Sequence, residues 1–206
     1  QAWTAYTTND TTAPSTSSLL NLNGRDFLTF KKLMMVGGNN ATASCINGTT
    51  AHSVNIVIQD CALIDTVLGT GVCIQYTGSA GIAANWTIDR CPFFGAGTTS
   101  SCIALSVPTI TGADYDLNFL VQDCTFEGTW ANGVIGTTTG ALANKGGGIK
   151  VFNCIHIGRG AILNVNSANF STSVPCTCYN SVSISGVGPC LIANTVGQLL
   201  EDNNRL

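Results

Sequence analysis

The sequence carries little charge. Only 9% of its 206 residues are Asp, Glu, Lys or Arg, and the net charge is −3. Beyond the neighbouring Lys31 and Lys32 there is no cluster of basic residues, so the electrostatic footprint of a nucleic-acid-binding protein is missing. No uninterrupted apolar run approaches the about 20 residues that a membrane-spanning helix needs. We therefore expect neither a nucleic-acid partner nor a membrane span.

An amphipathic helical pattern is also lacking, and a strand repeat stands in its place. Six times, alternating apolar residues lead into one polar residue, which is followed by Cys or by a residue in the equivalent place. Successive spacings of these polar residues are 28, 30, 33, 30 and 27. Because the apolar residues alternate with period two on both sides of the polar residue, each unit predicts strands. The polar residues are Lys32, Asp60, Arg90, Asp123, Asn153 and Asn180.

A second column of residues repeats with nearly the same period in the other half of each unit. Gly, Ser, Thr and Asn, which favour turns, lie between the two columns. A unit of roughly 29 residues built from short strands and turns, without helices, predicts an all-β parallel solenoid of about six coils. We place this domain at residues 26–206, after a Thr- and Ser-rich segment, residues 1–25, that is extended or capping. The second column is Cys45, Cys73, Cys102, Val134, Ile162 and Cys190.

The six polar residues predict the corners of the coils. Asn and Asp adopt the left-handed backbone conformation at the least cost after Gly. Stacked coils lie about 4.8 Å apart, so the first four side chains, Lys, Asp, Arg and Asp, would alternate in charge and attract one another. We therefore interpret these residues as a structural turn ladder rather than a charged binding strip. The next corner is expected near residue 208, beyond Leu206.

Eight of the ten cysteines occupy repeated positions: four directly follow a polar residue of the first column, and four belong to the second column. Stacking at about 4.8 Å places their Cβ atoms farther apart than the about 3.8 Å typical of disulfides, so mainly free, buried thiols are favoured over a disulfide framework. Cys176 and Cys178 form only half of a metal-ligand pattern, and no matching Cys or His pair lies elsewhere. We expect no metal and no cofactor.

Four segments carry a resemblance to a known family: residues 56–63, 86–93, 119–126 and 149–156. Their pattern resembles the right-handed parallel β-helix repeat of the pectate-lyase-like superfamily, over about residues 26–200. The resemblance implies a right-handed parallel β-helix. It specifies activity weakly, because this superfamily includes polysaccharide lyases, glycoside hydrolases, phage tailspikes and adhesins.

The enzymatic alternative rests on a few charged residues. The Asn-Thr-Asp, Asp-Asp, His-Gly and Arg-Ile-Lys strings of polygalacturonase-like members do not occur here. Asp89 and Asp123 could supply paired carboxylates for sugar hydrolysis, and Lys150 and Arg159 could contact an acidic sugar. Because Arg90 stands between neighbouring acids, we favour a structural turn ladder in which Arg90 neutralises the charge of these acids. His156 falls in an inward column and is expected to be a hydrogen-bonded core residue.

Outward positions of the strand that follows each corner are unusually apolar. A solvated sheet face would carry polar residues there, and an apolar stripe of several hundred square ångströms calls for a cover. Either a neighbouring chain, in a trimer or fibre, or residues 1–18 could provide it. The candidate interface residues are Ile64, Phe94, Ile155, Ile157, Val182 and Ile184.

These features favour a non-catalytic structural or adhesive module that assembles through the apolar stripe or through open solenoid ends. The alternative is a carbohydrate-active enzyme or a tailspike-like domain that binds a surface polysaccharide. The chain begins at Gln1 without an initiator Met or a signal peptide, which indicates a processed secreted protein or a fragment. We therefore expect an extracellular, cell-surface or virion-associated location.

Overall fold

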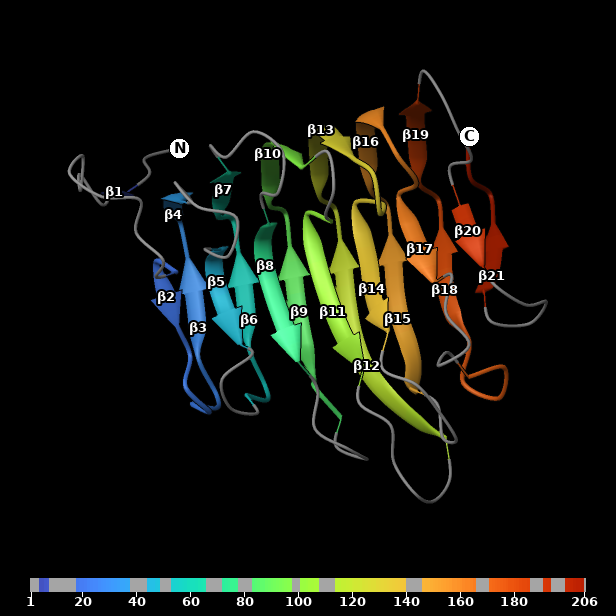
Figure 1. The fold of residues 1–206 in the computed structure, drawn as a ribbon, viewed down its shortest axis with the longest axis horizontal. Helices are drawn as coiled ribbons and strands as arrows, with labels where there is room; N and C mark the ends of the chain where they lie inside the picture. Colours follow the sequence, from blue (N-terminus) through green and yellow to red (C-terminus); the bar gives the residue numbers. More distant parts are fainter. Residues whose placement is uncertain are drawn as a thin grey trace.

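The chain forms a β-solenoid of three parallel sheets, here named A, B and C, as a computed structural model shows (Figure 1). The structure describes residues 4–7, 18–37, 44–48, 53–65, 72–77, 83–97, 101–107, 114–139, 146–165, 171–185, 191–193 and 199–205. Within these ranges there is no helix, and accordingly no helix long and apolar enough to cross a membrane.

Consecutive strands pass from sheet A to sheet B to sheet C, so each strand pairs with strands three places away in the chain. Sheet A contains β1 (Thr4–Thr7), β4 (Leu33–Gly37), β7 (Ala62–Asp65), β10 (Pro92–Gly97), β13 (Thr125–Trp130), β16 (Ile155–Arg159) and β19 (Val182–Ser185). Sheet B contains β2 (Leu20–Asn21), β5 (Ser44–Gly48), β8 (Val72–Thr77), β11 (Ile103–Val107), β14 (Ile135–Thr139), β17 (Leu163–Val165) and β20 (Leu191–Ala193). Sheet C contains β3 (Thr29–Lys31), β6 (Val57–Gln59), β9 (Trp86–Asp89), β12 (Tyr115–Gln122), β15 (Gly146–Phe152), β18 (Cys176–Tyr179) and β21 (Leu199–Asp202).

The all-β solenoid expected from the repeat is thus confirmed, with one more level than the about six coils predicted. Each sheet contains seven strands. Each of the six polar residues lies between two successive levels, so the six residues connect seven levels. Strands β1 and β2 lie within residues 1–25 and pair with β4 and β5. Strand pairing therefore begins before residue 26.

The chain turns from sheet C to sheet A at the polar residues of the repeat. Lys32, Asp60, Arg90, Asp123, Asn153 and Asn180 all have φ between 49° and 56°, in the left-handed region that a sharp bend requires. A seventh corner lies at Asn203, with φ of 53°, and its side-chain amide donates to Asn180 Oδ1. The corner expected near residue 208 therefore comes five residues earlier, because the last coil is shorter than the others.

A second set of left-handed residues marks the turn from sheet B to sheet C. Each lies five residues before a corner of the first set. Phe27, Asn55 and Asn85 precede β3, β6 and β9, whereas Asn118 and Gly148 lie within β12 and β15. Three are asparagines whose side chains form a ladder: Asn85 Nδ2 donates to Asn55 Oδ1 at 3.1 Å, and Asn118 Nδ2 donates to Asn85 Oδ1 at 2.8 Å. The set is Phe27, Asn55, Asn85, Asn118 and Gly148, with φ from 49° to 73°.

Large apolar side chains fill the space between the sheets in stacked columns. The rings of Trp86 and Phe119 stack at 5.7 Å between centroids, and those of Phe93 and Phe126 stack at 4.8 Å. All four side chains are buried. Because parallel stacking places equivalent residues above one another, each of these ring pairs joins two neighbouring coils.

Nine cysteines lie in the described residues, and all are free and buried, in agreement with the expectation of core thiols. Cys190 falls outside the described residues. Burial raises the pKa of Cys176 to about 12 and that of Cys178 to about 11, so both thiols are protonated at neutral pH. They therefore pack as small hydrophobic groups.

Candidate functional site

The most charged cluster on the solenoid is built around Arg90, at the corner between β9 and β10. Its Nε lies 2.9 Å from Asp60 Oδ1, and its Nη1 lies 2.6 Å from Asp89 Oδ2. The hydrogen bond from Arg90 lowers the pKa of Asp60. Asp60 and Arg90, at two successive corners, thus hold opposite charges in contact.

Asp89 is buried, with 4% of its surface exposed. Its carboxylate is contacted by donor side chains from three coils. Gln59 Nε2 donates to Oδ2 at 2.7 Å, and Gln122 Nε2 donates to Oδ1 at 3.1 Å. The register of β6, β9 and β12 places these three side chains one above another. With Arg90 added, three donors contact the buried carboxylate, which supports a structural role for this anion.

Asp123 has a different environment from Asp89. It is exposed and accepts a hydrogen bond from Asn153 Nδ2 at 2.9 Å. The two carboxylates share no hydrogen-bond partner among the described residues. Asp89 and Asp123 therefore differ both in burial and in hydrogen-bond partners.

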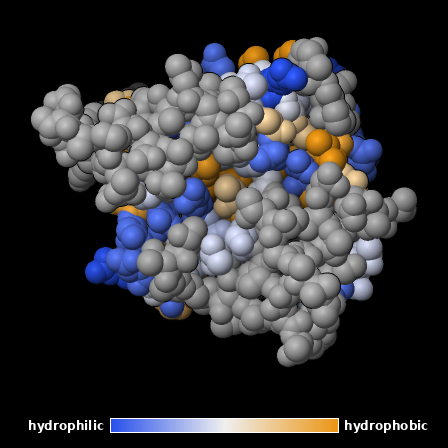
Figure 2. All heavy atoms as spheres, viewed as in Figure 1, coloured by the Kyte–Doolittle hydropathy of each residue, from blue (hydrophilic) through white to orange (hydrophobic). Residues whose placement is uncertain are grey.

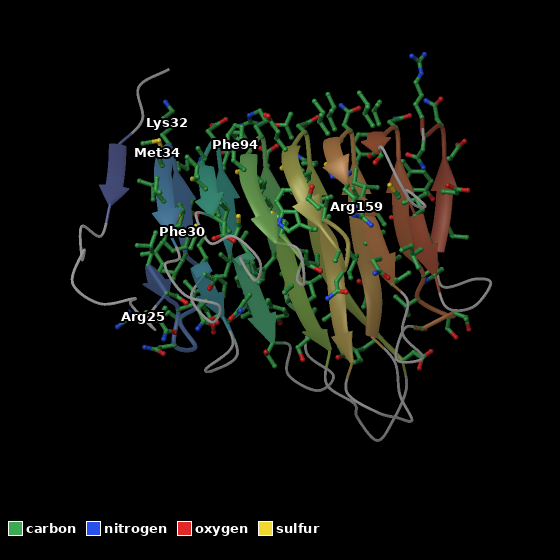
Figure 3. The ribbon with its side chains drawn as sticks, turned by 45° about the horizontal axis from the view of Figure 1, so that its top comes forward. Arg25, Phe30, Lys32, Met34, Phe94 and Arg159 are labelled. Carbon is green, nitrogen blue, oxygen red and sulfur yellow. The ribbon has the colours of Figure 1, made fainter. Side chains whose placement is uncertain are left out.

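Lys150 and Arg159 lie on different sheets. Lys150 is on β15 in sheet C, where its Nζ lies 3.3 Å from Asn118 Oδ1 and 4.0 Å from Asp116 Oδ2. Arg159 is exposed at the end of β16 in sheet A (Figure 3). The corner at Asn153 separates them, so the four charged residues considered for catalysis are not assembled into one site.

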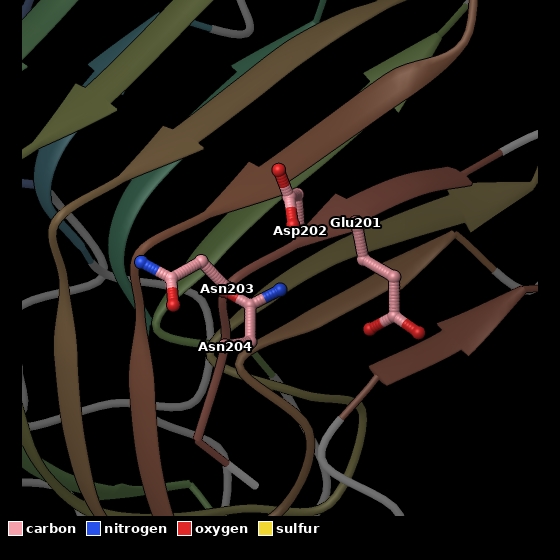
Figure 4. A pocket seen from close by; sticks show the side chains of 4 residues that line it. All are labelled: Glu201, Asp202, Asn203 and Asn204. Carbon is pink, nitrogen blue, oxygen red and sulfur yellow. The ribbon is translucent and has the colours of Figure 1, made fainter.

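A shallow polar hollow lies at the last coil (Figure 4). Its volume is about 310 Å³, and it is lined by Glu201, Asp202, Asn203 and Asn204. Among the described residues, no group of three or more His, Cys, Asp and Glu side chains is arranged to hold a metal ion.

Two polar residues of this last coil occupy columns that are mostly apolar or Cys in earlier coils. Glu201 pairs with the buried Cys178, in the column that begins with Phe30. Asn204 takes the place after the corner, where its Oδ1 accepts from the Ser181 N–H at 2.9 Å and its Nδ2 donates to Cys178 O at 2.9 Å. A further coil stacked here would bury the Glu201 carboxylate, which is costly without a partner.

The outer face of sheet A is the least polar exposed surface of the described chain. Phe94 is 38% exposed, Ile155 41%, Ile157 50% and Ile184 60%. Val182 and Ile64 are half-buried on the same face. In Figure 2, orange hydrophobic atoms reach the surface along the upper edge, where Figure 1 places the strands of sheet A.

The side chains of this face form two columns along the solenoid. The strand register places Ile64, Phe94, Glu127, Ile157 and Ile184 in one column. On β13, the exposed Thr125 and Glu127 interrupt the apolar surface. We call the outward residues of β10, β13, β16 and β19 the sheet A face.

His156 is fully buried beneath this face. Its Nδ1 lies 3.0 Å from Ser183 Oγ, and its Nε2 lies 3.4 Å from Gly128 O. Because a carbonyl oxygen only accepts, the proton belongs on Nε2, and Nδ1 accepts from the Ser183 hydroxyl. Burial lowers the pKa of His156, so the neutral ring is the stable form. This is the hydrogen-bonded core histidine that the column pattern predicted.

A pH-dependent loss of stability follows from the lowered pKa of His156. Below about pH 6.5 the histidine of the unfolded chain takes up a proton that the folded chain resists. The unfolding free energy is therefore expected to fall between pH 7 and 5.5, by at most about 1.4 kcal/mol per pH unit from this group. Urea denaturation at several pH values measures it. The double variant H156F/S183A, which removes the ring nitrogens and the hydroxyl together, should have a shallower slope; an unchanged slope would assign the effect to other groups.

No protein-family model, curated protein or solved structure matches the chain. The functional assignment therefore depends on the geometry of the solenoid.

Proposed function

We propose that the chain is a non-catalytic structural or adhesive β-solenoid module that associates with other copies through the sheet A face. The observation that carries the proposal is the row of exposed apolar side chains at Phe94, Ile155, Ile157 and Ile184, which are 38–60% exposed. Ile155, Ile157 and Ile184 lie on the neighbouring strands β16 and β19, and Phe94 lies beyond Thr125 and Glu127 of β13. Water contact with these apolar side chains is unfavourable, and exposed apolar surface of this kind marks an interaction site. A location outside the cell or on a virion, and a relationship to the pectate-lyase-like superfamily, accompany this proposal.

Lateral association is favoured over stacking of solenoid ends. At the last coil, Glu201 and Asp202 are exposed, and Glu201 occupies an inward column. A charge that points inward at a sheet edge opposes pairing with a further strand. Association through the sheet A face needs no pairing with a further strand, because its side chains already project from paired strands.

The second candidate is binding of a surface polysaccharide, and one observation favours it. Phe152 is 41% exposed and lies beside the half-buried Tyr179 on the outer face of sheet C. Exposed aromatic rings bind sugar rings through their apolar faces. This surface belongs to a different sheet from the proposed interface, so the two functions can be tested separately.

The self-association proposal is tested by placing charges on the sheet A face. The variant I184K is expected to weaken self-association by about tenfold or more, because Ile184 pairs in register with Ile157 and a lysine there would have to be buried without a partner. The matched control, L200K, adds the same charge at an apolar position of sheet C that is 46% exposed. Analytical ultracentrifugation should find the control associated and I184K largely monomeric, with circular dichroism showing that both are folded. Equal association of the two folded variants would overturn the proposal.

A further inference from the structure

We infer that the partner on the sheet A face is a second copy of this chain, packed with its solenoid axis antiparallel about a twofold axis between β13 and β16. The inference rests on the proposed function and adds the orientation and size of the assembly. The exposed face spans β10, β13, β16 and β19. Its centre therefore lies between the two middle strands.

The two charges of the face determine which orientation is favourable. Glu127 on β13 and Arg159 on β16 are both exposed. The register pairs Arg159 with Thr129, so Glu127 and Arg159 are offset by one strand and by two residues. Neither joins the ion pairs found among the described residues. Within the described part of the chain, both charges are thus open to a partner.

A parallel arrangement, in which copies surround an axis along the solenoid, brings each strand opposite its own equivalent. Glu127 would then approach Glu127 of the next copy, and Arg159 would approach Arg159. Like charges brought together at an interface are repelled, and this repulsion selects against that orientation. The disfavoured arrangements include a parallel trimer.

An antiparallel arrangement about the central axis brings β13 opposite β16 of the second copy, and β10 opposite β19. Glu127 then faces Ile157 of the second copy, about 7 Å along the strand from Arg159, within reach of the long arginine side chain. The twofold axis generates two such pairs. It also places Phe94 against Ile184, the most exposed apolar residue of the face.

The size of the face sets the strength of the dimer. Four strands about 4.8 Å apart, each with about five residues of about 3.3 Å, form a face of roughly 300 Å² in projection, which is smaller than the about 800 Å² per partner of a standard protein–protein interface and fits a weak, concentration-dependent dimer. Because the same patch is used on both copies, the interface closes after two chains. The inference therefore selects a dimer rather than a fibre.

Charge reversal tests the orientation separately from self-association. E127R and R159E are each expected to weaken dimerisation by about tenfold, because each places like charges opposite one another twice. The double variant E127R/R159E should restore the original affinity by exchanging the two signs. As a control, D202R reverses an exposed charge on sheet C and should leave dimerisation unchanged.

Sedimentation velocity over a concentration series gives the dissociation constants. If the single variants dimerise as tightly as the unmodified chain, or if the double variant fails to recover, the antiparallel orientation is wrong while association through the face still stands. If the unmodified chain does not associate at all, the proposed function itself is wrong.

Discussion

Replacing Phe126 by alanine is expected to lower the free energy of unfolding by about 3–5 kcal/mol. Its side chain is 1% exposed and stacks on Phe93 with 4.8 Å between ring centroids and 16° between planes. The neighbouring coils are held by strand pairing on both sides and cannot move to close the space. Alanine therefore leaves a cavity inside the solenoid, in addition to the lost apolar burial.

The matched control is Phe152→Ala, the same substitution at a side chain that is 41% exposed. It should cost less than about 1 kcal/mol, because little buried surface and no enclosed cavity are involved. Urea denaturation with linear extrapolation measures both. Equal losses at the two positions would contradict the stacked core described for this column.

Replacing Asp89 by asparagine is expected to cost about 2–3 kcal/mol. Gln59, Gln122 and Arg90 all donate to its carboxylate. An asparagine has only one acceptor oxygen, so its own amide would meet a donor inside a nearly closed site. The substitution also removes the negative charge that faces the Arg90 guanidinium, and a buried donor left without an acceptor bears its full desolvation cost.

Asp123→Asn is the control for this second substitution. Asp123 is exposed and has one described donor, Asn153, so a loss under about 1 kcal/mol is expected. Thermal or urea unfolding of both variants distinguishes two roles for Asp89. A structural anion predicts the large loss, whereas a catalytic carboxylate held at the expense of stability predicts that D89N is at least as stable as the unmodified chain.

The corners could be predicted from the sequence because the left-handed conformation restricts residue choice. Asp60, Asp123 and Asn153 carry this signal directly, and their spacing extends it to Lys32 and Arg90. The second set of corners was missed, although Asn55, Asn85 and Asn118 repeat five residues before the first set. Phe27 before these asparagines and Gly148 after them occupy the same column. A column with such mixed residue types is hard to recognise without the backbone.

The outward positions of the sheet A face also followed from the sequence. A period of two fixes which side of a strand each residue faces once one residue of the strand is placed. The inward position of Glu201 did not follow, because the last coil has a different length and the columns lose their alignment there. The separation of Lys150 from Arg159 was available from their places on opposite sides of the corner at Asn153.

The environment of Asp89 could not be derived from the sequence. Gln59 and Gln122 each precede a corner, as Asp89 does, but a column of Gln, Asp and Gln is equally compatible with solvated side chains. Only the stacking distance and the side-chain directions show that the amides and Arg90 meet on one carboxylate. This closure moves the interpretation of the cluster from catalysis to structure.

Sedimentation equilibrium of the unmodified chain measures directly whether the sheet A face is covered by a second copy. At concentrations raised to the order of 1 mM, where weak interfaces of this size are populated, we expect the mass to rise toward twice that of the 21.3 kDa chain. A mass of 21.3 kDa that does not change with concentration would show that the face remains open, and would contradict self-association as the function of this solenoid.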